Sequence, residues 1–156
     1  MIVRQISDRQ LALAMRVLLV CVSLGFAAFL VVLNLIRIAS EGNQPEFAHL
    51  GIPVYVGVLL GFVPIYVAIA RFWRIAGRFA VSRTITSALL DDVRVIRNSA
   101  VIVAGWFTIG LLLFFATFRV VGPPPIVAWL FIELSTLSVA VVATVVLRLL
   151  GTAVAE

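Results

Sequence analysis

The chain has 156 residues, of which 63% are hydrophobic and only 12% are charged. Soluble domains carry charged residues at about a quarter of their positions, so this composition excludes an ordinary water-soluble domain. The net charge is +5 and all twelve basic residues are arginine. Because the arginines flank long apolar stretches, they indicate membrane topology rather than direct nucleic-acid binding.

The first apolar stretch covers residues 11–36 and follows a short basic segment. A basic start before an apolar stretch is also typical of a secretory signal, but this stretch is longer than the roughly 7–15 residues of a signal core. It therefore predicts a retained transmembrane helix. The single cysteine, Cys21, lies inside this helix, where a small buried apolar role is expected.

A polar connection over residues 37–50 contains the only histidine, His49, near Glu41 and Glu46. A metal site needs three or four ligands in a workable geometry, and one histidine with two separated acids does not supply them. We expect a solvated histidine and no metal here.

The second predicted span covers residues 52–70, with Pro53 at its start and Pro64 inside it. Gly57 and Gly61 have the GxxxG spacing, which lets two membrane helices approach closely. The pair is a candidate contact face, either inside the chain's own helical bundle or with another protein. The same spacing is also common by chance in apolar sequence.

Residues 71–98 form a basic segment, the hinge, that separates two apolar pairs and holds half of the arginines. Ile85, Leu89, Val93 and Ile96 recur at a helical period. This pattern predicts an amphipathic cytoplasmic helix between spans 2 and 3, on the membrane surface and running into the third span. Its role is either interfacial packing or docking of a cytoplasmic partner. The candidate docking residues are Arg78, Arg83, Asp91, Asp92, Arg94 and Arg97.

The third and fourth spans are predicted over residues 99–118 and 126–147, with a proline-rich turn between them. Each of the four apolar stretches approaches or exceeds the roughly 20 residues that cross about 30 Å of hydrocarbon. The expected fold is all-α: a four-span transmembrane helical bundle forming a single integral membrane domain over residues 1–156.

The arginines also predict orientation. Ten of the twelve lie in the N-terminal part, the hinge and the C-terminal end, and two, Arg37 and Arg119, lie in the other two connections. Cytoplasmic loops carry the excess of basic residues. Both termini and the hinge are therefore expected in the cytoplasm. The lack of lysine, together with abundant alanine and valine, indicates a GC-rich bacterial genome, and the expected location is the bacterial inner membrane.

Glu133 is the ionisable residue most clearly inside a span. An acid at membrane depth costs several kcal/mol near the bilayer centre, so it tends to face other helices or a polar cavity. A candidate intramembrane polar contact joins Glu133 with Asn34 and Arg37. Such a contact is either a structural hydrogen-bond anchor, an ion or proton site, or a contact with another subunit.

No pattern of residues predicts catalysis. The chain has no nucleophile–histidine–acid set, no glycine-rich phosphate loop and no paired cysteine spacing. We therefore expect a protein that is not an enzyme, with no cofactor.

From about residue 50 to residue 150 the chain resembles a family of small four-helix bacterial integral membrane proteins of unknown function. The resemblance rests on the segment Pro64, Ile65 and Tyr66, on the exit RFWRIAG, and on FAVSRTITSALLDDVRVIRNSA before the third span. The hinge departs from the family by having arginine where lysine is usual, and the N-terminal third matches only in hydropathy. The resemblance implies no activity. Members of the family are often encoded beside a small Cro/CI-type repressor gene. The resemblance therefore implies that the protein tethers such a regulator to the membrane.

Two hypotheses follow. The first is a non-enzymatic accessory or regulatory subunit of a larger membrane assembly such as a transporter, in its most specific form an ABC-linked lipid importer of the mammalian-cell-entry class. The alternative is a membrane anchor that sequesters a cytoplasmic Cro/CI-type transcriptional repressor. The expected partners are membrane lipids, another membrane protein or transport complex, and a small cytoplasmic regulator. An autonomous carrier is less favoured, because the four spans show no inverted repeat.

Overall fold

A computed structural model of the chain describes residues 8–43, 48–79, 86–118 and 123–155. These residues form four α-helices: α1 (Asp8–Asn43), α2 (Ala48–Phe79), α3 (Ser87–Phe118) and α4 (Pro123–Ala155). Each helix holds a stretch long and apolar enough to cross a membrane, namely Ala12–Ala39, His49–Arg78, Ser87–Thr117 and Trp129–Leu150. The predicted all-α, four-span fold is confirmed.

The helices extend beyond the predicted spans. α1 continues through Arg37, and α2 already begins five residues before Pro53 and runs on through Pro64. Pro123, expected in a turn, is instead the first residue of α4. Proline is tolerated in a first helical turn, because the backbone N–H groups there have no acceptor within the helix.

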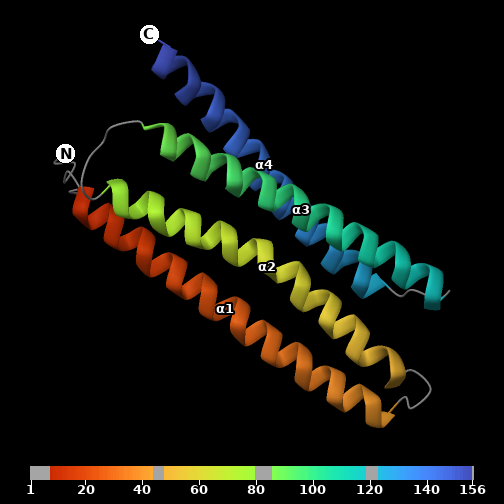
Figure 1. Cartoon of the computed structure of the whole chain (residues 1–156). Helices are drawn as coiled ribbons and strands as arrows, with labels where there is room; N and C mark the ends of the chain where they lie inside the picture. Colours follow the sequence, from red (N-terminus) through yellow and green to blue (C-terminus); the bar gives the residue numbers. More distant parts are fainter. Residues whose placement is uncertain (1–7, 44–47, 80–85, 119–122, 156) are drawn as a thin grey trace, which may run out of the picture.

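The helices pack in the order in which they occur in the chain. α1 contacts α2, α2 contacts α3, and α3 contacts α4, and no other pair of helices comes into backbone contact within the described ranges. Figure 1 shows α1 beside α2 and α3 beside α4. α1 is therefore an outer helix, held by one neighbour.

The contact between α1 and α2 is aromatic in its middle part. The ring of Phe62 lies edge-on to Phe26, with centroids 5.4 Å apart, and it stacks with Phe29 at 6.1 Å. Tyr66 donates a 3.4 Å hydrogen bond to the backbone carbonyl of Ser23. Phe62 is buried by these contacts, but Ala12 is the only residue of α1 that is buried where the structure describes burial.

The buried core lies at the hinge end of the molecule, where α2 ends and α3 begins. Ile75 of α2, Ala143 of α4 and three residues of α3 (Leu89, Val93 and Ile96) form one apolar cluster. The amphipathic stretch predicted in the hinge is thus the first part of α3. Its apolar side is covered by α2 and α4, which corrects the expectation that it lies on the membrane surface. Ile85 lies outside the described residues.

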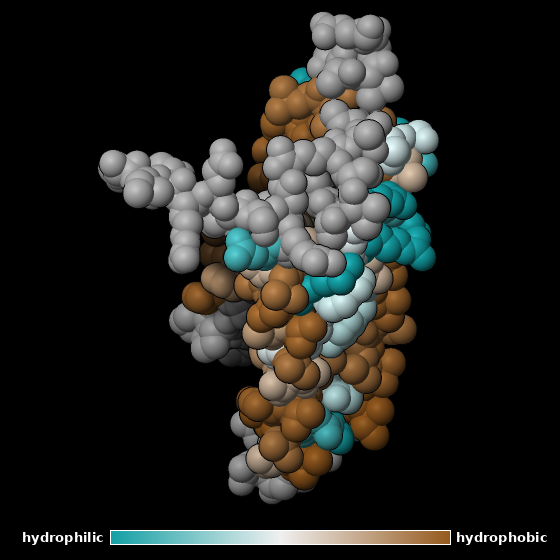
Figure 2. All heavy atoms as spheres, turned by 90° about the vertical axis from the view of Figure 1, so that its left-hand side faces the viewer, coloured by the Kyte–Doolittle hydropathy of each residue, from teal (hydrophilic) through white to brown (hydrophobic). Residues whose placement is uncertain are grey.

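Most of the remaining surface is apolar. Large exposed hydrophobic side chains occur on all four helices, and Figure 2 shows them over most of one face, with hydrophilic groups toward its upper part. Lipid tails are as apolar as these side chains, so such a surface is stable in hydrocarbon.

Candidate functional site

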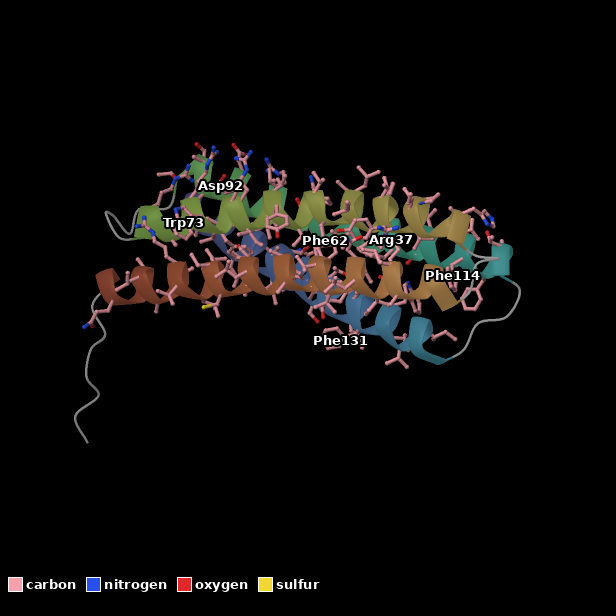
Figure 3. The ribbon with its side chains drawn as sticks, turned by 90° about the horizontal axis from the view of Figure 1, so that it is seen from below. Arg37, Phe62, Trp73, Asp92, Phe114 and Phe131 are labelled. Atoms are coloured by element: carbon pink, nitrogen blue, oxygen red, sulfur yellow. The ribbon has the colours of Figure 1, made fainter. Side chains whose placement is uncertain are left out.

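A buried carboxylate joins α2 to α3 at the hinge end. Asp92 is 2% exposed. Its Oδ1 accepts a 3.0 Å hydrogen bond from Nη1 of Arg71, and its Oδ2 accepts a 2.6 Å bond from Nη1 of Arg78. The two arginines are seven residues apart, about two helical turns, so both project from the same side of α2. Asp92 therefore fixes two turns of α2 against α3, near Trp73 in the view of Figure 3.

This ion-pair cluster corrects the predicted docking surface. Asp92 is buried and bonds to Arg71 and Arg78 of the same chain, so it does not face a cytoplasmic partner. Arg94 pairs with Asp91 at 2.8 Å on the exposed side of α3, and Arg97 donates to Asn98 Oδ1 at 3.1 and 3.3 Å. Asp91, Arg94 and Arg97 therefore keep their charged groups on the accessible side of α3, and the Arg78 side chain is 41% exposed although it is paired. Arg83 lies outside the described residues.

The two glycines of the GxxxG motif lie beside Trp106 of α3 in the same chain. Nε1 of Trp106 donates a 2.8 Å hydrogen bond to the backbone carbonyl of Gly57. A Cβ on Gly61 would lie 2.8 Å from Cδ1 of Trp106 and 3.0 Å from Cε2 of Phe107, whereas a Cβ on Gly57 would meet nothing within 4 Å. Of the two positions, only position 61 therefore needs glycine, because a larger side chain there would collide with α3.

Glu133 bonds to α3. Its Oε1 accepts a 2.6 Å hydrogen bond from Oγ1 of Thr108, and Nε1 of Trp129 donates a 3.2 Å bond to the same hydroxyl. This two-bond chain joins α4 to α3 inside the apolar stretches of both helices. It gives the carboxyl group the polar neighbour that an acid at membrane depth requires.

The predicted grouping of Glu133 with Asn34 and Arg37 is wrong. Nε of Arg37 donates to Oδ1 of Asn34 at 3.1 Å, and its guanidinium carbon lies 5.8 Å from the ring centroid of Tyr55. Asn34 and Arg37 belong to α1, which does not contact α4 in the described structure. Hydropathy gives the depth of a residue in the membrane but not the helix that it faces.

We expect the contact between Thr108 and Glu133 to be energetically coupled. The test is a double-mutant cycle of Thr108→Val, Glu133→Leu and the double variant. The sum of the two single losses in the free energy of unfolding should exceed the loss in the double variant by about 0.6 kcal/mol and at most about 1.7 kcal/mol. Reversible unfolding in mixed detergent micelles measures it. Thr117→Val is the matched control, since Oγ1 of Thr117 bonds to its own helix at Leu113. Strict additivity of the two single losses would contradict this contact.

A further arginine, Arg16, lies between α1 and α2. Its guanidinium carbon is 5.5 Å from the ring centroid of Trp73, close enough for a cation–π interaction. Its Nη2 lies over Gly77, where a Cβ would be 3.0 Å away. Its Nε is buried and has no hydrogen-bond partner among the described residues.

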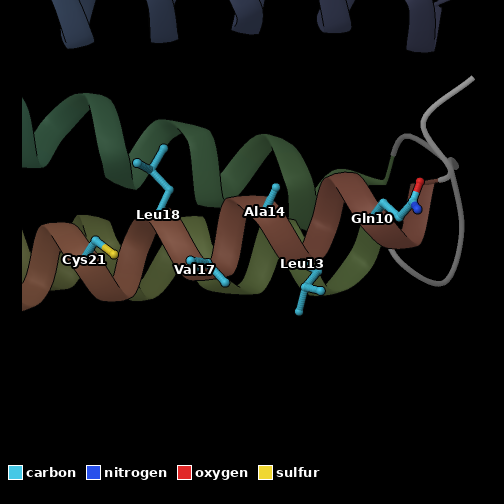
Figure 4. Close-up of a pocket in the computed structure, with 6 residues that line it drawn as sticks. All are labelled: Gln10, Leu13, Ala14, Val17, Leu18 and Cys21. Atoms are coloured by element: carbon cyan, nitrogen blue, oxygen red, sulfur yellow. The ribbon is translucent and has the colours of Figure 1, made fainter. Parts of the chain in front are cut away.

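One line of residues along the exposed surface of α1, called the seam below, carries mostly small side chains. They recur at intervals of four and three residues, the spacing of a helix–helix seam, and all are exposed: Ala14, Leu18, Cys21, Gly25 and Ala28. No atom would lie within 4 Å of a Cβ on Gly25. The first three of these residues also line an open hollow on α1 (Figure 4), together with Gln10, Leu13 and Val17.

Four contacting residues were not singled out for these roles from the sequence: Arg71, Thr108, Trp106 and Arg16. The seven-residue spacing of Arg71 and Arg78 was a usable signal for a shared acidic partner on another helix. Thr108 and Trp106 gave no comparable signal, because single polar groups in apolar helices also bond to their own backbone or face lipid.

The described residues contain no group of three histidine, cysteine or acidic side chains that would hold a metal ion. His49 is exposed in the first turn of α2.

Four long apolar helices, joined by polar contacts between their faces, define a multi-pass helical membrane protein. Residues 35–155, more than three quarters of the chain, match the family described as "Protein of unknown function (DUF2975)". The chain belongs to this family, which confirms the resemblance to a membrane protein family of unknown function. Searches of the curated proteins and of the solved structures gave no match to the chain.

Proposed function

We propose that the chain is a non-enzymatic accessory or regulatory subunit of a larger bacterial membrane assembly, such as a transporter. The observation that carries this proposal is the position of α1. This helix contacts α2 alone, and only Ala12 is buried along its described length. Most of its circumference is therefore available to lipid or to another protein.

The seam on α1 supports a protein contact on this free side. Small side chains let two helix backbones approach closely, and close packing is the main source of helix association in lipid. Gly25 and Ala28 continue the line that begins at Ala14 and Cys21, and all four are exposed. The glycines that the sequence favoured for this role are less suitable, since Gly61 is occupied by contacts with α3.

The test is affinity purification of the tagged protein in mild detergent, at native expression, with Gly25→Leu as the variant. We expect the wild type to recover a membrane partner at constant stoichiometry and Gly25→Leu to lose it, because the leucine separates the helices. Gly110→Leu is the matched control. Gly110 is also an exposed helical glycine with nothing within 4 Å of its Cβ position, so both variants should fold.

Recovery of transporter subunits would support the transport role, and recovery of lipid-importer subunits of the mammalian-cell-entry class would support its most specific form. A protein that purifies without any partner, or a partner that survives both variants equally, would contradict the proposal that α1 is the contact helix.

The alternative function, an anchor for a Cro/CI-type repressor, is favoured by the exposed charges of α3. The Arg94 side chain is 57% exposed, and Arg97 bonds to the neighbouring Asn98 rather than to another helix. We expect Arg94→Glu with Arg97→Glu to release an acidic cytoplasmic partner, with binding that weakens as salt rises. Arg148→Glu, also at an exposed arginine, should leave the partner bound. Equal release by both would contradict the anchor.

Both functions assume the inner membrane, with the termini and the segment between α2 and α3 in the cytoplasm. The excess of arginines at these positions supports this orientation. In a Cys21→Ala background, Val121→Cys should react with a membrane-impermeant maleimide in intact spheroplasts and Val81→Cys should not. The reverse pattern would contradict the orientation.

A further inference from the structure

A basic face crosses α1 and α2 near the end of the molecule that holds the core. It consists of Arg16 on α1 and of Arg74 and Arg78 on α2. At about 100° per residue, Arg74 is offset by about 60° from Gly77, over which Arg16 lies, and by about 40° from Arg78. The three guanidinium groups therefore follow one another around the same side of the two helices.

The positive charge of the basic face is only partly balanced. Asp92 is the one described carboxylate that bonds to α2, and Arg71 and Arg78 already share it. Arg74 is exposed, and no described residue accepts a hydrogen bond from it. Nε of Arg16 is buried, and no residue that the structure describes accepts a hydrogen bond from it. None of the ion pairs among the described residues involves Arg16 or Arg74, so an anion that accepted hydrogen bonds from their outer N–H groups would be stabilised.

The depth of the basic face indicates a lipid. Arg16 and Arg74 each lie four residues inside the end of an apolar stretch, about 6 Å along the helix axis. This is within the zone where headgroups meet hydrocarbon. Trp73 is 42% exposed beside them, and tryptophan is enriched in this zone.

Apolar surface adjoins the arginines as well. On α1, the neighbours of Arg16 at Leu13, Val17 and Val20 are all exposed. An inorganic anion has no apolar group that could pack against this surface, whereas the acyl chains of a lipid would cover it.

We propose that the basic face binds the phosphate group of an anionic glycerophospholipid. The N–H groups of Arg16 and Arg74 donate to the phosphate oxygens, Trp73 packs beside the headgroup, and the acyl chains lie along Leu13, Val17 and Val20. The arginines of this site lie outside the seam on α1, whereas Leu13 and Val17 also line the hollow beside the seam. The proposal does not depend on the proposed function.

Native mass spectrometry of the full-length protein in detergent tests this site, with phosphatidylglycerol and phosphatidylcholine as probes. We expect phosphatidylglycerol to bind preferentially. Arg16→Gln and Arg74→Gln should each lower its affinity about fivefold, the loss that corresponds to one basic residue near an anionic lipid, and should leave phosphatidylcholine unchanged. Arg148→Gln is the matched control, since it removes the same charge from α4.

Arg74→Gln keeps the test decisive if Arg16→Gln unfolds, because the exposed Arg74 has no described partner to lose. Equal binding of the two lipids, or an equal loss in Arg148→Gln, would overturn the proposal. A third arm adds inorganic phosphate at the concentration of the lipid. Full displacement of phosphatidylglycerol would overturn the assignment to a lipid in favour of a free-anion site, and retention of the lipid would support it.

Discussion

Replacement of Asp92 by asparagine is expected to lower the free energy of unfolding by about 2–4 kcal/mol. Removing one partner of a buried ion pair costs about 3–5 kcal/mol, because the remaining charge is left without compensation. The side chains of Arg71 and Arg78 are 33% and 41% exposed. Water can therefore hydrate the unpaired guanidinium groups, which makes the loss smaller. Unfolding in mixed micelles, followed by tryptophan fluorescence, measures the change.

The neighbouring acid provides a matched control for this prediction. The Asp91 side chain is 66% exposed and, among the described residues, pairs with Arg94 on its own helix. Asp91→Asn should therefore change stability by less than about 0.5 kcal/mol. A triple variant, Asp92→Asn with Arg71→Gln and Arg78→Gln, should recover part of the loss, because no unpaired charge remains. Equal losses for Asp91→Asn and Asp92→Asn would show that the cluster does not hold α2 against α3.

Replacement of Gly61 by valine is expected to cost about 1–3 kcal/mol, the usual range for overpacking a closely packed contact. The new Cβ would lie 2.8 Å from Trp106, whose ring is held in place by its hydrogen bond to Gly57. Moving the indole away would lengthen or break that bond. The variant should also shift the fluorescence of Trp106, provided that Trp73 and Trp129 are replaced by phenylalanine in both proteins compared.

The other glycine of the motif is the control. Gly57→Ala adds a methyl group where nothing lies within 4 Å and leaves the carbonyl that accepts the indole N–H. Its stability should stay within about 0.5 kcal/mol of the wild type. If Gly57→Ala and Gly61→Val destabilise equally, the contact with Trp106 is not the reason for glycine at position 61.

Residues of the candidate sites could be predicted only in part. Gly61 and Glu133 were recognised as contact residues from spacing and from charge at membrane depth. Their partners, Trp106 and Thr108, were not, because the partner of a helix face depends on which helices are neighbours. Asp92 looked like one of several surface charges of an amphipathic helix. Its burial follows from the approach of Arg71 and Arg78 on α2.

The number of spans and the all-α fold were determined by the sequence alone. The thickness of the hydrocarbon sets the length of each apolar stretch, and the cost of unpaired backbone groups in lipid requires helices. Only the tertiary structure decided that the helices pack in chain order, that α1 has a single neighbour, and that Glu133 meets Thr108 rather than Arg37. In lipid, a side chain that faces another helix is as apolar as one that faces the membrane, so hydropathy cannot distinguish the two.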